Sequence, residues 1–100
     1  MKLKDIAQVV RSKNAGPRVL TLDIMLADQA AFDRVRASPA LRPDAVGRLY
    51  ETPADQVRVI EYPLSRAIKI ALPRKVMAGD PGDSDVYGAQ QHARLLEIEL

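Results

Sequence analysis

The segment RVLTLDIML, residues 18–26, alternates so that every second side chain is a branched apolar one. This period of two is typical of a β-strand with one buried face. The buried side is predicted to hold Leu20, Leu22, Ile24 and Leu26. The opposite side holds Val19, Thr21, Asp23 and Met25. Because an unpaired buried carboxylate is costly, Asp23 needs solvent, a cation or a covering chain on its face. Asp23 is therefore also a candidate ligand contact.

Similar alternation in VRVIEY, residues 57–62, and RAIKIAL, residues 66–72, predicts two more strands. In the second of these, every other residue from Ile68 onward faces the core, and Lys69 faces away. The short Pro63–Ser65 stretch between the two segments indicates a bend or a tight connection.

The N-terminal segment fits two regular structures. Its apolar residues Leu3, Ile6 and Val10 have helical spacing, but the last two equally suit a strand. The favoured interpretation is a strand over about residues 5–11. The RSKNAGP stretch is then the loop to the next strand, since its asparagine and glycine tolerate positive φ and its proline lacks the N–H that a ladder needs.

Two helices are predicted between the second and third strands. Asp28 can cap a helix over residues 29–37. Pro43 suits the first position of a helix over residues 43–51, where a missing N–H costs nothing. The apolar faces are predicted to carry Phe32 and Val35 in the first helix and Val46, Leu49 and Tyr50 in the second.

The C-terminal third begins with a long polar loop over residues 73–88, followed by a helical turn over residues 89–94. Alternation of leucine and isoleucine with glutamate over residues 96–100 predicts a last strand. The resulting order predicts a single α+β domain over residues 1–100. It is a small two-layer sandwich, a mostly antiparallel sheet with two helices on one face, ferredoxin-like or related.

Composition narrows the class of protein further. A hydrophobic fraction of 47% and a charged fraction of 28% are ordinary for a globular domain. The absence of cysteine excludes disulfides, thiolate–zinc sites and cysteine nucleophiles. A net charge of +2 with 4% aromatic residues argues against a nucleic-acid partner. No apolar run approaches the roughly 18 residues of a membrane span, so we expect no membrane contact. We also expect a cytoplasmic protein without a cofactor.

The RSKNAGP stretch is the first candidate for chemistry. Arg11 and Lys13 supply positive charge, Ser12 and Asn14 supply hydrogen bonds, and the backbone at Gly16 can approach a ligand closely. Together they suggest an anion site. The spaced glycines and the GK[ST] ending of a phosphate-binding P-loop are lacking. The alternative is a plain turn whose polar side chains face water.

The stretch GDPGDSDVYGAQQH, residues 79–92, is the second candidate. Its aspartates resemble a calcium loop in outline, but the glycine and glutamate of an EF-hand are missing, so a solvated turn is favoured over a metal site. These aspartates are Asp80, Asp83 and Asp85. Asp85, Gln90 and Gln91 remain candidate ligand contacts.

His92 is the natural general acid or base of that stretch, because its ordinary pKa lies near neutrality. Tyr87 is a second candidate to move a proton. The alternative for His92 is a purely structural role, which is the commoner fate of a lone histidine. The function proposed for either cluster depends on folding bringing the two together.

Several segments resemble a bacterial family, the domain of unknown function 4387. They are DIAQVVRSKNAGP with TLDI, then AIKIALPR, GDPGDSDVYGAQQHA and LLEIEL. Members of that family often occur beside a larger protein similar to the acyclic terpene utilisation protein AtuA. A weaker similarity links the chain to the small ferredoxin-like domain of AtuA-like proteins, although the first polar stretch departs from that domain's loop at Lys13 and Ala15.

Three functions follow as expectations. The resemblance implies an accessory subunit that associates with an AtuA-like large protein, or with copies of itself, and contributes polar groups to a site for an organic acid or acyl-CoA. The second is a stand-alone small lyase, hydratase or isomerase that acts on a carboxylate. Arg11 or Lys13 would then hold the substrate while His92 or Tyr87 moves the proton. The third is a structural or regulatory domain without a ligand.

Overall fold

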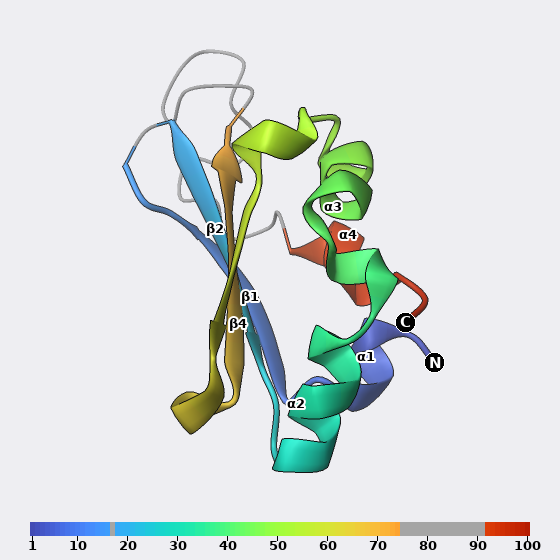
Figure 1. Cartoon of the computed structure of the whole chain (residues 1–100). Coiled ribbons are helices and arrows are strands. Elements are labelled where there is room, and N and C mark those ends of the chain that lie inside the picture. The colour runs from blue at the N-terminus through green and yellow to red at the C-terminus, as the bar shows by residue number, and fades with distance from the viewer. Residues whose placement is uncertain (17, 75–91) are drawn as a thin grey trace.

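The computed structural model describes residues 1–16, 18–74 and 92–100. A four-stranded antiparallel sheet forms one layer, and helices lie on one of its faces (Figure 1). The strands, in their order across the sheet, are β1 (Val9–Asn14), β2 (Val19–Met25), β4 (Ala67–Pro73) and β3 (Arg58–Tyr62). The helices are α1 (Leu3–Ile6), α2 (Gln29–Arg36), α3 (Pro43–Tyr50) and α4 (Ala93–Leu96), with 3-10 turns η1 (Pro39–Leu41), η2 (Ala54–Gln56) and η3 (Pro63–Ser65).

The predicted two-layer α+β class is confirmed. The described strands and the two longer helices follow the order β-β-α-α-β-β. That order differs from the β-α-β-β-α-β order of a ferredoxin-like domain, so the chain is a related sandwich with its own connectivity. None of the helices in the described ranges is long and apolar enough to cross a membrane.

The core lies between the sheet and the helices. β2 contributes the predicted face, with Leu20, Leu22 and Ile24 at most 3% exposed. The inward residues of β4, namely Ile68, Ile70 and Leu72, are equally buried. From the helix layer, Phe32, Val35, Val46 and Tyr50 close over them. Burial of these side chains is the main favourable term in folding, at roughly 1.5–3 kcal/mol for each large apolar residue.

Both predicted helices form with the expected first turns. The Asp28 carboxylate accepts the backbone N–H of Ala31 at 2.8 Å and so caps α2. Pro43 is the first residue of α3. α3 ends where Glu51 adopts a left-handed backbone, with φ of 56°.

The N-terminal prediction was partly wrong. The helical spacing of Leu3 and Ile6 is realised as the single turn α1, and the strand then begins at Val9 and runs to Asn14. Residues 12–14, predicted as loop, therefore belong to β1 and pair with β2. Only the short stretch after Asn14 makes the turn, where Gly16 has φ of 94°.

The C-terminal prediction was also partly wrong. The expected strand over residues 96–100 is reduced to one isolated bridge between Lys2 and Glu99. The described part of the predicted helical turn is α4 at Ala93–Leu96, while residues 89–91 and most of the predicted loop over 73–88 lie outside the described residues. Arg94 holds α4 against α3: its guanidinium donates to the Leu49 carbonyl at 3.1 Å and lies 5.7 Å from the ring centre of Tyr50. Burial raises the pKa of the Tyr50 phenol, so this ring packs as a neutral group.

Candidate functional site

The structure joins the two polar stretches at one point, between Ser12 and His92. The Ser12 hydroxyl accepts the backbone N–H of His92 at 3.1 Å. The same oxygen lies 3.3 Å from Nδ1 of the His92 ring. Ser12 is 7% exposed and faces the helix layer, because its position on β1 lies opposite the buried Leu22 of β2. Two segments 80 residues apart in sequence are thus fastened at the edge strand.

This contact is compatible with either protonation state of the histidine. In the neutral tautomer protonated at Nε2, the hydroxyl of Ser12 donates to Nδ1. In the imidazolium, Nδ1–H donates instead and the hydroxyl oxygen accepts. The Ser12 hydroxyl thus contacts both the ring and the backbone of His92. Ser12 therefore positions His92. That the His92 ring transfers a proton stays a prediction.

Asp23 is the buried carboxylate of the opposite, uncovered face of the sheet. Its neighbours in register are Arg11 on β1 and Lys69 on β4. Nε of Arg11 donates to the carboxylate at 3.3 Å. The Asp23 side chain is 9% exposed and that of Arg11 is 56% exposed. The Arg11 cation thus stabilises the Asp23 carboxylate. A cation is one of the three environments expected for Asp23 from its sequence position.

Strand geometry divides the predicted anion site between two faces. Successive side chains of a strand point to opposite sides. Arg11 and Lys13 face the uncovered side, whereas Ser12 and Asn14 face the helix side. A ligand resting on one face of β1 therefore meets either the two cations or the two hydrogen-bonding groups.

The remaining residues of the first stretch have separate surroundings. The Asn14 amide oxygen accepts a hydrogen bond from Arg74 at 3.0 Å, which ties the end of β1 to the end of β4. The Lys13 carbonyl accepts the Thr21 hydroxyl at 3.2 Å, while the Lys13 side chain is exposed. Gly16 is exposed, and the space around it is open. Its glycine is explained by the positive φ of the turn.

Part of the second stretch lies outside the described residues. This concerns Tyr87, Asp85, Gln90 and Gln91, as well as Asp80 and Asp83. Their proposed roles in ligand binding, proton transfer or metal binding therefore stay predictions. Within the described ranges, no group of three or more histidine or acidic side chains is placed to hold a metal ion.

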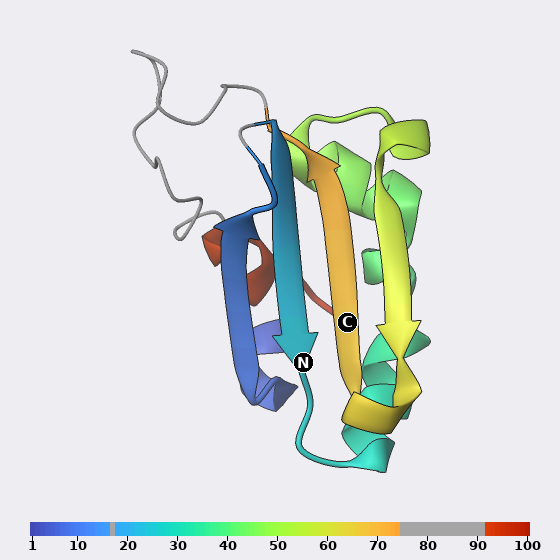
Figure 2. The ribbon, with the colours of Figure 1, turned by 90° about the vertical axis from the view of Figure 1, so that its left-hand side faces the viewer.

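Sequence reasoning missed the apolar character of the uncovered sheet face, seen face-on in Figure 2. Within the described ranges, the exposed large hydrophobic residues are Val9, Val19, Tyr62, Leu64 and Met1. All except Met1 lie on this face or on the η3 turn at its end, where Leu64 is fully exposed. Alternation had already placed Val19 on the uncovered side, but nothing in the local sequence distinguishes an exposed turn leucine from a buried one.

Comparison with known proteins yields one family. No curated protein and no solved structure matches the chain. A family model described as "Domain of unknown function (DUF4387)" matches residues 3–99, which includes all of the described strands and helices. The chain therefore belongs to the DUF4387 family.

Proposed function

We propose that this chain is an accessory subunit that docks its uncovered sheet face onto a larger protein of the AtuA-like type. The observation that carries the proposal is that exposed Val9 and Tyr62 lie in one row across that face, beside the end turn that carries exposed Leu64. Exposed Val19 lies on the same face, at the other end of β2. An antiparallel sheet can leave one face in water, but that face is then normally polar. Exposed apolar residues gathered on one side are instead typical of a protein interface.

The face has an ordered arrangement of apolar and charged rows. Register places Val9, Met25, Ala67 and Tyr62 side by side across the four strands, next to the turn that carries Leu64. The neighbouring rows bring Arg11, Asp23, Lys69, Lys13 and Arg58 onto the same face. Positive charge therefore exceeds negative charge there. A complementary partner would present an apolar patch beside an acidic one.

The same face suggests where an organic acid or acyl-CoA would bind. Arg11 and Lys13 both point to it, and Lys13 makes no ion pair with another described residue. A carboxylate or phosphate held between these cations and the partner would be shielded from solvent, which strengthens charge-assisted hydrogen bonds. The subunit would thus complete a site that neither protein builds alone.

Co-expression with the neighbouring AtuA-like protein tests the docking. We expect the two chains to co-elute in size-exclusion chromatography at micromolar concentration. Leu64→Ser is expected to weaken the affinity about tenfold or more, as truncation of a large apolar contact at an interface does. Lys13→Glu is expected to weaken it at low salt through charge repulsion.

The matched control is Arg34→Glu, a charge reversal on the exposed side of α2, away from the sheet. It should leave co-elution unchanged. Separate elution of the wild-type proteins would contradict the proposal. So would an equal loss of affinity in the Lys13 and Arg34 variants, because the sheet face would then have no special part.

A stand-alone enzyme is the second candidate, and the Ser12–His92 contact favours it. A histidine held by a hydroxyl in both protonation states is suited to general acid–base work. The face alternation of β1 weighs against it, since Arg11 and Lys13 point away from the side on which Ser12 meets His92. Turnover of small carboxylates by the purified chain, compared with His92→Ala, tests it; equal rates would remove His92 from the mechanism.

A further inference from the structure

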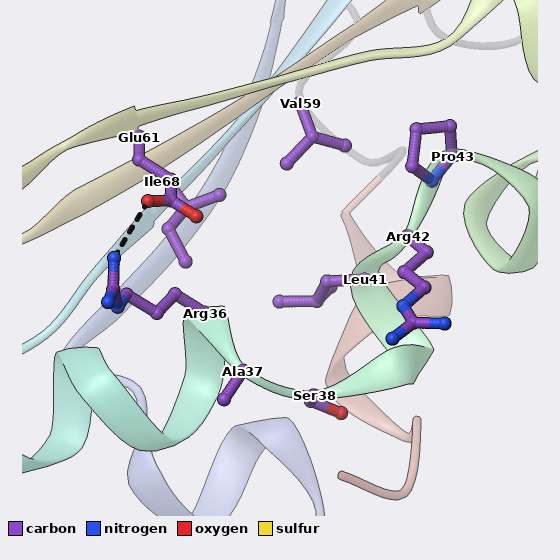
Figure 3. Close-up of a pocket in the computed structure, with 9 residues that line it drawn as sticks. All are labelled: Arg36, Ala37, Ser38, Leu41, Arg42, Pro43, Val59, Glu61 and Ile68. Carbon is purple, nitrogen blue, oxygen red and sulfur yellow. Dashed lines mark hydrogen bonds and ion pairs between the residues drawn. The ribbon is translucent and has the colours of Figure 1, made fainter.

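A pocket of about 410 Å³ lies on the helix side of the sheet, where α2, η1 and the start of α3 meet β3 and β4 (Figure 3). Val59, Pro43 and Ala37 provide the accessible part of its apolar lining. Leu41 and Ile68, at most 3% exposed, lie beneath them. The side chains of Leu41 and Val59 point toward the middle of the opening. The volume is within the range of small-molecule sites in proteins.

Charged groups stand on two sides of this pocket. On one side, Arg36 is already compensated: it donates to Glu61 at 3.1 Å and lies 3.5 Å from the carboxylate of Asp33. On the other side, Arg42 is exposed and makes no ion pair with any residue in the described ranges. The lining therefore carries one uncompensated positive charge beside an apolar surface.

The backbone fixes Arg42 at this position. It joins η1 to α3, and its N–H donates to the Pro39 carbonyl at 3.2 Å while its carbonyl accepts from Val46 at 3.0 Å. Because both backbone groups are used, the residue is firmly placed although its side chain is exposed. An arginine held at the lip of an apolar pocket offers a planar, permanent cation for a carboxylate.

We propose that this pocket binds a small monocarboxylate with an apolar tail. The tail would lie on Val59 and Pro43, above the buried Leu41 and Ile68, and the carboxylate would meet Arg42. One uncompensated cation matches a single negative charge, whereas Glu61 at the other side repels a second one. The site is separate from the uncovered sheet face, since the lining residues of β3 and β4 point to the helix layer. It does not depend on docking to a partner.

Titration of the purified chain with butanoate, hexanoate and octanoate, followed by calorimetry and by amide chemical shifts, tests the site. Each added methylene is expected to raise the affinity about fourfold, the factor that burial of one such group provides. Hexan-1-ol and hexylammonium should bind more weakly than hexanoate. The largest shift changes should fall on residues around Leu41 and Val59.

Arg42→Gln should weaken hexanoate about tenfold or more, the usual effect of losing a charge-assisted hydrogen bond. Arg34→Gln is the matched control, since it removes an exposed arginine of α2 that does not line the pocket, and it should leave the affinity unchanged. The proposal is overturned if hexanoate does not bind at millimolar concentration, if hexan-1-ol binds as tightly, or if the two arginine variants behave alike.

Discussion

Ser12 is a buried hydroxyl whose two hydrogen-bond partners among residues 92–100 both belong to His92. Replacement by alanine removes both contacts and leaves the backbone N–H of His92 without its acceptor. We therefore expect Ser12→Ala to lower the free energy of unfolding by about 1–2 kcal/mol, the cost of an unsatisfied buried donor. Urea unfolding of the two proteins measures the difference.

Ser65→Ala is a suitable control for that substitution. Ser65 is exposed, and its hydroxyl donates only a long 3.4 Å hydrogen bond to the Tyr62 carbonyl. Its replacement should change the free energy of unfolding by less than about 0.5 kcal/mol. If Ser12→Ala were equally mild, the contact with His92 would not hold the C-terminal segment to β1.

The sequence named Ser12 and His92 as candidate residues but could not predict that they touch. Alternation and capping are local signals, whereas a contact between positions 80 residues apart depends on the completed fold. The ion pair between Arg11 and Asp23 was half foreseen: a partner for the carboxylate was required, and only the register of β1 against β2 identifies it.

Elements with strong local signals were predicted closely. β2 and β4 combine alternation with a fully buried face, and α2 and α3 begin with a capping aspartate and a first-turn proline. In each of these elements, the local backbone preference and the burial of the apolar side chains favour the same structure. The layers of the sandwich followed from these four elements.

β1 was misplaced because its inward side does not look like a core. Val10, Ser12 and Asn14 face the helix layer, so two of the three are polar. The edge of the sheet tolerates this, since Ser12 is satisfied by His92 and Asn14 by Arg74. Because the inward side chains of β1 are mostly polar, its sequence lacks the alternation of apolar residues that predicts a strand. The contacts that satisfy these side chains come from residues far along the chain.

Gly47 provides a test of close packing between α3 and the segment that follows it, residues 52–54. It is buried within the helix, and a Cβ at this position would lie 2.5 Å from the Thr52 carbonyl oxygen. That oxygen belongs to the backbone and cannot turn aside. Although alanine favours helices, we expect Gly47→Ala to lower the free energy of unfolding by about 1–3 kcal/mol through overpacking.

Ala30→Gly on the exposed side of α2 measures helix preference without this contact. It should cost about 1 kcal/mol, the ordinary difference between the two residues in a helix. If preference alone governed Gly47, its replacement by alanine would stabilise the protein by a similar amount. A gain in thermal unfolding temperature for Gly47→Ala would therefore contradict the packing account.

The first and last residues of the molecule are joined by a set of contacts that we call the clasp. It consists of the ion pairs of Lys2 and Lys4 with Glu97 and of the β-bridge between Lys2 and Glu99. The two ends of the described chain lie side by side (Figure 1). Glu97 accepts from Lys2 at 2.8 Å and from Lys4 at 3.0 Å. Leu3 N–H also donates to the Ile98 carbonyl, which joins α1 to the segment after α4.

The clasp gives stability a defined dependence on pH. The hydrogen bond from Lys2, together with that from Lys4, holds the pKa of the Glu97 carboxyl below its ordinary value of 4.5. The same contact raises the pKa of the Lys2 ammonium above 10.5. A carboxyl with a lowered pKa stabilises the folded state above its ordinary value, and this stability is lost as the pH falls through the folded pKa. The Lys2 contribution is complete below pH 10.5 and is lost above it.

Glu97→Gln should therefore lower the thermal unfolding temperature between about pH 5 and pH 10. The difference from wild type should shrink as the pH falls below 4.5 and through the lowered pKa of the folded state, where the carboxylate takes up a proton. In about 1 M salt the difference should also shrink, because the screening length falls to roughly 3 Å. Asp55→Asn is the control, since Asp55 makes no ion pair with another residue of the described ranges. A difference between Glu97→Gln and wild type that stayed constant from pH 7 to pH 3 would mean that the side chain acts by packing, and that the charge of Glu97 has no part in joining the ends.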